Sequence, residues 1–111
     1  MTRKIVFYKN YFLDFYKNLD KEVKTKIQYV FELIQQVENV PVKFLKSIAG
    51  YDGVFEIRVE YQSNIYRIFC TFDEGKLVVV FNGFQKKSQK TPKQVLEKAY
   101  RLKNEYFINK K

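Results

Sequence analysis

Residues 53–87 contain three consecutive stretches in which apolar side chains recur at the spacing of β-strands, with short polar breaks between them. Apolar and polar residues alternate in the first two stretches, 55–60 and 66–72. Because successive side chains of a strand point to opposite faces of a sheet, each of these stretches has one apolar face. The third stretch, 77–81, is apolar on both faces and should be covered on both sides. The pattern predicts a three-stranded antiparallel meander.

Helical patterns precede the predicted meander. A short strand is expected within 3–8, followed by a short helix over 10–18. A longer helix is expected to begin after Asp20, a suitable N-cap, and to end near Asn39, because Pro41 restricts the residue before it. Apolar residues recur every three or four positions in this helix, which is typical of a helix that packs against a sheet.

A last helix is expected at the C-terminus. Thr91 to Gln94 match a capping box with Pro92 at the first helical position, and the residues that follow form an apolar stripe with a basic outer face. The expected order is therefore strand, two helices, three or four strands and a helix. This order predicts an α+β fold, with an antiparallel meander, an N-terminal helical hairpin and a C-terminal helix, in one domain over residues 1–111.

The chain is strongly basic. Lys and Arg number 21 against 12 Asp and Glu, which gives a formal net charge of +9, and aromatic residues make up 18% of the sequence. A basic domain is expected to meet polyanions, because each phosphate that it neutralises releases counterions. The positive excess is greatest from Lys86 onward. For these C-terminal cations, a solvated lysine-rich surface is the alternative interpretation.

The composition restricts the chemistry. Histidine is absent and Cys70 is the single cysteine, which excludes His/Cys zinc sites and nucleophiles activated by histidine. No metal or other cofactor is expected, and a reaction would have to use Lys, Arg, Tyr, Asp or Glu. Cys70 falls at an inward strand position and is expected to be a small core residue in a reducing cytosol. No apolar run approaches the roughly 18 residues of a membrane span and no secretion signal is evident, so a cytoplasmic location is expected.

Several short motifs carry a resemblance to a known family. In order they are Gly53-Val54-Phe55-Glu56-Ile57-Arg58, Ile65-Tyr66-Arg67-Ile68, Val80-Phe81-Asn82-Gly83-Phe84-Gln85-Lys86-Lys87 and Gln89-Lys90-Thr91-Pro92. Together they resemble the HigB-like, phage-derived branch of the RelE/ParE toxin superfamily, over essentially the full chain. The resemblance implies a sheet with helices on one side and a basic concave surface on the other. It also implies an enzyme that cuts messenger RNA on the ribosome and is held inactive by a cognate antitoxin, often a helix-turn-helix protein of the HigA type.

The resemblance also indicates candidate site residues. Arg58 falls on the arginine of the family's Glu-Leu-Arg motif, Arg67 on that of its Tyr-Arg-Ile motif, and Lys86 and Lys87 on the basic pair that closes the last strand. Several relatives carry a histidine or tyrosine near that strand end, where this chain has Gln85 and the two lysines. The resemblance therefore leaves the general acid unidentified.

Cleavage of RNA would require specific roles of these residues. RNA can be cut by attack of its own 2′-hydroxyl, which requires a base, a charge clamp on the phosphorane and an acid for the leaving oxygen. Arg58 and Arg67 are the expected clamp, because the guanidinium fork binds two phosphate oxygens. Lys86 or Lys87 is a candidate acid or base, and Glu56 is either a base or a structural partner of Arg58. RNA contacts are expected from Lys43, Lys46, Phe84 and Lys90, with Phe84 stacking on a base.

Arg67 is expected to be exposed on its strand, where an ion pair contributes only about 0–1 kcal/mol to stability. Two other functions remain open at this point. One is a ParE-like toxin that poisons DNA gyrase through protein contacts, and the other is a non-catalytic phage protein that binds nucleic acid or a partner. A nuclease requires Arg58, Arg67 and Lys86 or Lys87 to converge on one concave surface, whereas a gyrase-binding toxin does not.

Overall fold

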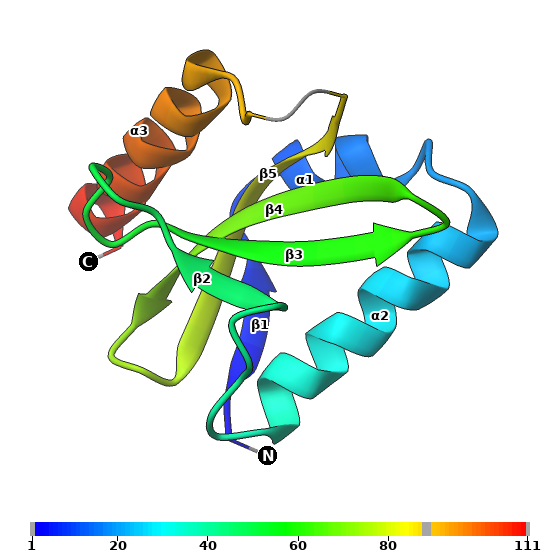
Figure 1. The fold of residues 1–111 in the computed structure, drawn as a ribbon. Helices are drawn as coiled ribbons and strands as arrows, with labels where there is room; N and C mark the ends of the chain where they lie inside the picture. The colour runs from blue at the N-terminus through cyan, green and yellow to red at the C-terminus, as the bar shows by residue number, and fades with distance from the viewer. Residues whose placement is uncertain (1, 88–89, 111) are drawn as a thin grey trace.

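The computed structural model describes residues 2–87 and 90–110 and shows a five-stranded sheet between helices (Figure 1). Its elements are β1 (Lys4–Phe7), α1 (Tyr11–Tyr16), α2 (Lys21–Gln36), β2 (Leu45–Ser47), β3 (Phe55–Tyr61), β4 (Asn64–Asp73), β5 (Leu77–Lys86) and α3 (Lys93–Asn109). Strands β3, β4 and β5 form the predicted antiparallel meander. The predicted α+β fold is confirmed.

The two outer strands come from distant parts of the sequence. Across the sheet the order is β1-β5-β4-β3-β2. Strand β1 pairs in parallel with β5, with Lys4 opposite Leu77, while the short β2 pairs antiparallel with β3 at the other edge. β5 therefore lies between two strands, and it is apolar on both faces because α1 packs on one face and α3 on the other.

Helices α1 and α2 cover one face of the sheet. The inward face of α2 is buried, as the sequence pattern predicted, and consists of Val23, Ile27, Val30, Phe31 and Ile34. These side chains pack on strand residues such as Ile57 and Ile68. The helix ends at Gln36, earlier than predicted, and the Arg3 guanidinium donates to the carbonyl oxygens of Ile34 at 2.8 Å and Val37 at 2.7 Å. Arg3 thus satisfies carbonyl groups that the helix end leaves open.

Helix α3 packs on the opposite face, mainly over β4 and β5, where Ala99 contacts the Phe69 cluster and Leu102 the Phe81 cluster. The resemblance implied helices on one side of the sheet only, and this is wrong: helices lie on both faces, and the part of the second face toward β2 and β3 remains outside the main contacts of α3 (Figure 1). The predicted capping box is wrong: α3 begins at Lys93, with Pro92 at the N-cap position and no side-chain cap bond. Gln89 of the last sequence motif lies outside the described residues.

Two hydrogen-bonded clusters hold the C-terminal half of α3. Tyr106 donates to Asp73 at 2.6 Å, and Lys110 donates to the same carboxylate at 2.8 Å. The hydrogen bond to Asp73 and burial raise the pKa of Tyr106 to about 12, while the hydrogen bonds from Lys110 and Tyr106 lower the pKa of Asp73. Glu105, the residue before Tyr106, accepts a hydrogen bond from the hydroxyl of Tyr8. The position of α3 over the sheet is thereby fixed.

A β-bulge changes the direction of β5 halfway along its length. Two β5 residues, Phe81 and Asn82, stand where β4 has only Phe69. The next residue, Gly83, lies against α1, because a Cβ atom there would come within 2.8 Å of a ring carbon of Phe15. Bulges bend a strand and re-aim its side chains. Beyond the bulge, Phe84 lies on the α3 face of the sheet, where it stacks on Phe69.

Candidate functional site

The predicted site residues lie in neighbouring rows across the second face of the sheet. Arg58 of β3 stands directly opposite Arg67 of β4, which in turn stands opposite Phe84 of β5. One row away on one side, Glu56 occupies the same face of β3, and one row away on the other side, Lys86 occupies the same face of β5. Side chains directly opposite each other have Cβ atoms about 5 Å apart, and those on the diagonal about 7–8 Å. The register therefore brings Arg58, Glu56 and Arg67 within reach of one another and places Phe84 and Lys86 beside Arg67, whereas Glu56 and Lys86 lie on opposite sides of the arginine row.

Glu56 is the centre of this group. Its two carboxylate oxygens bridge the arginines: Oε1 lies 3.5 Å from Nε of Arg67, and Oε2 lies 3.4 Å from Nε of Arg58. Like charges directly opposite each other in a sheet are destabilising. The Glu56 carboxylate offsets this repulsion and allows the two guanidinium groups to lie close together. We call Arg58, Glu56 and Arg67 the arginine cluster.

Arg67 is buried, which corrects the expectation that it is exposed. The residue is only 3% exposed, and one of its terminal nitrogens donates to the carbonyl oxygen of Tyr66 at 3.3 Å. Burial, and secondarily the charge of Arg58, lowers the pKa of the Arg67 guanidinium, while Glu56 acts in the opposite direction. On the central strand β4, Arg67 stands between Arg58 and Phe84, on the face of the sheet that α3 partly covers.

The other members of the group reach the surface to different degrees. The side chain of Arg58 is 27% exposed and that of Glu56 is 13% exposed. Glu56 opens onto a hollow of about 390 Å³ between β2 and the start of α3, which Lys46, Thr91 and Leu96 also line. Lys46 stands opposite Glu56 in the β2–β3 register. Solvent, and a ligand in this hollow, can therefore reach the Glu56 carboxylate.

The predicted residues outside the arginine cluster lie around it. Lys86 is partly exposed at the end of β5, and Lys87 is exposed just after it. Lys90 is exposed in the segment before α3 and lies outside the rows of the sheet. Phe84 is partly buried, with its ring stacked on that of Phe69 at a centroid distance of 6.1 Å. Phe84 is therefore part of the packing beneath α3, and any stacking on a base would use its other face.

Lys43 precedes β2 and lies at the edge of the sheet. It lines a hollow of about 300 Å³ together with Lys26, Phe44, Arg58 and Glu60. Lys26 belongs to α2 and was not among the predicted residues. In the sequence it is one of several lysines beside the apolar stripe of that helix, so only the folded structure distinguishes it from its neighbours.

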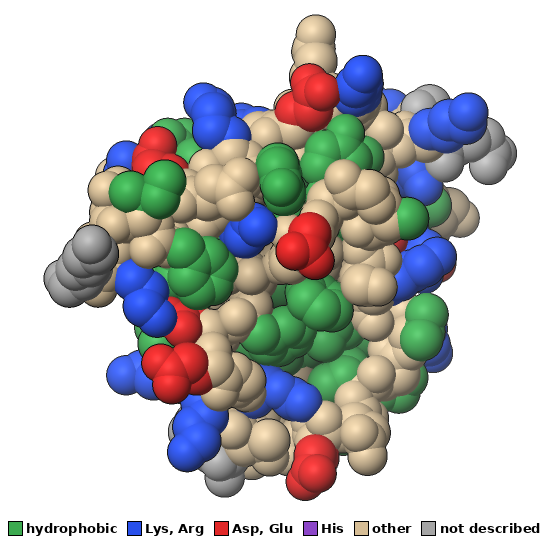
Figure 2. Space-filling view, turned by 90° about the vertical axis from the view of Figure 1, so that its left-hand side faces the viewer, with side chains coloured by type: hydrophobic (Ala, Val, Ile, Leu, Met, Phe, Trp, Pro, Cys, Tyr) green, Lys and Arg blue, Asp and Glu red, His purple; other side chains and the backbone are tan. Residues whose placement is uncertain are grey.

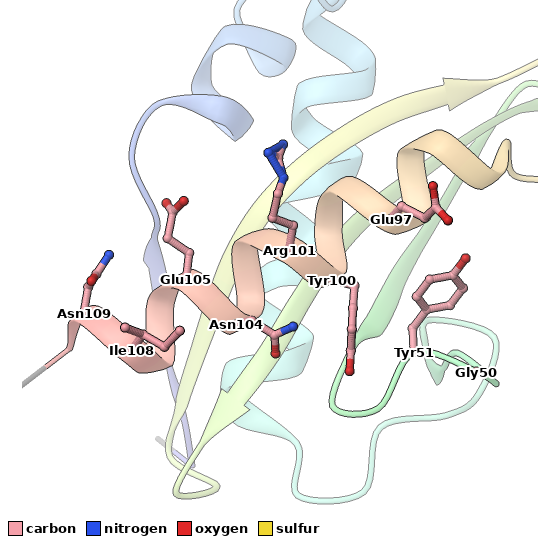
Figure 3. Close-up of a pocket in the computed structure, with 9 residues that line it drawn as sticks. All are labelled: Gly50, Tyr51, Glu97, Tyr100, Arg101, Asn104, Glu105, Ile108 and Asn109. Carbon is pink, nitrogen blue, oxygen red and sulfur yellow. The ribbon is translucent and has the colours of Figure 1, made fainter.

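A larger hollow, of about 720 Å³, lies between α3 and the loop before β3, and Figure 3 shows that the ring of Tyr51 lies beside that of Tyr100 there. None of the predicted site residues lines it. Figure 2, which views the left-hand side of Figure 1, shows hydrophobic side chains near the centre of that side, with side chains of both charges around them. This side of the molecule is not a continuous cationic surface.

The described residues offer no exposed thiol and no group of side chains that could bind a metal ion. Cys70 is fully buried, and burial raises the pKa of its thiol, which confirms the predicted core position. Residues 2–87 and 90–110 contain no group of three or more Cys, Asp or Glu side chains that could hold a metal ion. None of the described helices is both long enough and apolar enough to cross a membrane.

Comparisons with known proteins agree with this fold. Residues 14–104 match the model of the family described as phage-derived protein Gp49-like (DUF891). A chain in the crystal structure of the RelB-RelE antitoxin-toxin complex from Methanococcus jannaschii is similar with a TM-score of 0.55 and 19% sequence identity, over 78% of this chain and 99% of that chain. At this identity the likeness shows a common fold. No curated protein sequence gives a significant match.

Proposed function

The chain belongs to the Gp49-like family of phage-derived proteins and has a RelE-like fold, and from this premise we propose that it is the toxin of a toxin–antitoxin pair that cuts messenger RNA on the ribosome. The arginine cluster is the observation that carries the proposal. Two guanidinium groups on neighbouring strands share one carboxylate, on the face of the sheet that α3 partly covers. Lysines adjoin this cluster on both sides, Lys46 on β2 and Lys86 on β5.

In the proposed reaction the 2′-hydroxyl of a nucleotide attacks the adjacent phosphorus and loses its proton to the Glu56 carboxylate. The bond from phosphorus to the 5′ oxygen breaks, and the leaving oxygen takes a proton from the ammonium group of Lys86. The products are a 2′,3′-cyclic phosphate and a free 5′-hydroxyl. Arg58, the more exposed arginine, holds the phosphorane oxygens. Arg67 is buried and does not contact the phosphate; it orients the Glu56 carboxylate and adds positive charge to the site.

This division of roles follows from accessibility. A charge clamp must contact the phosphate, and Arg58 reaches the surface while Arg67 does not. A general base must lie within hydrogen-bond reach of the hydroxyl, and Glu56 opens onto the hollow beside β2. Its two oxygens carry about four lone-pair sites, so the two arginine contacts leave capacity for a proton.

We propose an antitoxin partner as well. The structural neighbour from Methanococcus jannaschii comes from an antitoxin–toxin complex, and the net charge of +9 favours rapid capture by an acidic partner. A helix-turn-helix protein of the HigA type is the proposed partner, and the cytoplasm, where ribosomes are found, is the proposed location.

Expression of the chain without an antitoxin tests the function. We expect growth to stop and incorporation of labelled amino acids to fall before incorporation of labelled thymidine. Early loss of DNA synthesis with strand breaks would instead support a gyrase-poisoning toxin. Normal growth at a confirmed level of folded protein would support a non-catalytic binding protein.

A further inference from the structure

Three cations from separate parts of the fold meet at one edge of the sheet. Lys26 comes from α2, Lys43 from the turn before β2, and Arg58 from β3. They line the hollow of about 300 Å³ already described, together with the ring of Phe44 and the carboxylate of Glu60. We call this hollow the edge site. Three positive charges and one negative charge give it a net positive charge.

The two lysines of the edge site have no carboxylate partner in the described part of the chain. Among residues 2–87 and 90–110, neither Lys26 nor Lys43 lies within 4.0 Å of an Asp or Glu oxygen. Each ammonium group instead lies over an aromatic ring, Lys26 over Tyr29 at 5.3 Å and Lys43 over Phe44 at 5.1 Å. Among the residues that the structure describes, Glu60 is the one carboxylate that lines this hollow, so part of the repulsion among its three cations remains, and an anionic ligand would offset it.

The edge site is continuous with the arginine cluster. Arg58 belongs to both, because its Nε contacts Glu56 at 3.4 Å and its side chain also lines the hollow. A strand of RNA carries phosphates at regular intervals, so a chain held at Arg58 places a neighbouring phosphate close by. The hollow is small and polar, and one aromatic wall is available for a base. These features fit a nucleotide unit better than a helix of a partner protein, which binds in an extended apolar groove.

We propose that the edge site binds a second phosphate of the same single-stranded RNA whose scissile phosphate is held at Arg58, an inference that rests on the proposed function. Lys26 and Lys43 then act as binding residues that fix the register of the RNA. They take no part in the chemical step.

The test compares two double variants of equal charge. Lys26→Ala/Lys43→Ala removes two cations from the edge site. The control, Lys21→Ala/Lys76→Ala, removes two exposed lysines that do not line it. Thermal melting first establishes that both variants fold. Binding of a fluorescent single-stranded RNA oligonucleotide is then measured by anisotropy over a range of salt concentrations.

Loss of one phosphate contact lowers the slope of log affinity against log salt by about 0.7 for single-stranded nucleic acid. We expect that change, with weaker binding at every salt concentration, for the edge-site variant and a clearly smaller change for the control. Equal changes in the two variants would overturn the edge site while leaving the proposed function intact. Absence of RNA binding by the unaltered chain would overturn the edge site as a phosphate-binding site, whereas the proposed function would be overturned only by absence of cleavage on ribosomes. Unchanged RNA binding together with weakened binding of an acidic antitoxin peptide would assign the edge site to a protein partner and contradict the inference.

Discussion

Replacing Arg67 by alanine tests the most consequential difference between the sequence-based expectation and the structure. Replacing an exposed arginine by alanine would cost little folding stability. The structure instead places Arg67 at 3% exposure, with Glu56 at 3.5 Å and the carbonyl oxygen of Tyr66 at 3.3 Å. Its removal leaves Glu56 less compensated and opens space between strands β3 and β5. We therefore expect Arg67→Ala to destabilise the fold.

The size of the effect can be judged from the contacts. Removing one partner of a buried ion pair costs about 3–5 kcal/mol. Glu56 keeps Arg58 as a partner and is itself 13% exposed, which places the expected loss near the lower end, at about 3 kcal/mol. Arg67→Met retains most of the side-chain volume, and combining it with Glu56→Gln removes the uncompensated carboxylate. We expect this double variant to recover stability to within about 1 kcal/mol of the unaltered chain.

Urea unfolding followed by circular dichroism gives these free energies, with the slope of the transition as a check that the unfolded states are comparable. A loss below about 1 kcal/mol for Arg67→Ala would mean that Arg67 behaves as a surface residue. The described burial and the inner role proposed for Arg67 would then both be wrong. The double variant also separates stability from function, because it should be folded and yet fail to cut RNA.

Three further predictions follow from individual contacts. Glu56→Gln removes the proposed base and should slow messenger RNA cleavage in a purified translation system by about 10²–10⁴-fold; an unchanged rate would assign Glu56 a structural role alone. Gly83→Ala places a Cβ atom 2.8 Å from a ring carbon of Phe15 and should lower the free energy of unfolding by about 1–3 kcal/mol, whereas a neutral effect in urea would mean that α1 moves freely. Because the pKa of Tyr106 is raised from 10.0 to about 12, its hydrogen bond to Asp73 stabilises the fold below pH 10 and is lost as pH rises through about 12. The stability difference between the unaltered chain and Tyr106→Phe should shrink over that range in denaturant titrations, and a constant difference would contradict the assignment.

The meander could be predicted because its signal is local. Alternation over 55–60 and 66–72 sets which side chains face the core, and the predicted burial of Cys70 is confirmed. The pairing of β1 with β5 could not be predicted in the same way, because Lys4 and Leu77 are far apart in the sequence and no local pattern indicates that their strands pair.

The site could be predicted only in part, for reasons that differ between residues. Alternation placed Arg58 and Arg67 on one face, and the register confirms that they stand opposite each other. The same pattern does not reveal how deeply a side chain lies, because depth depends on the neighbouring strands and on where α3 packs. Lys26 could not be identified at all, since its role depends on α2 approaching the turn that carries Lys43.

The most direct test of the proposed function is to map RNA ends in a reconstituted translation system that contains the purified chain. We expect new 5′ ends within the messenger RNA, only where it is bound to ribosomes, and each upstream fragment should end in a 2′,3′-cyclic phosphate. We also expect Arg58→Ala to abolish these ends while remaining folded. Messenger RNA that stays intact while the folded chain is present, or cleavage that persists unchanged in Arg58→Ala, would contradict the proposed function.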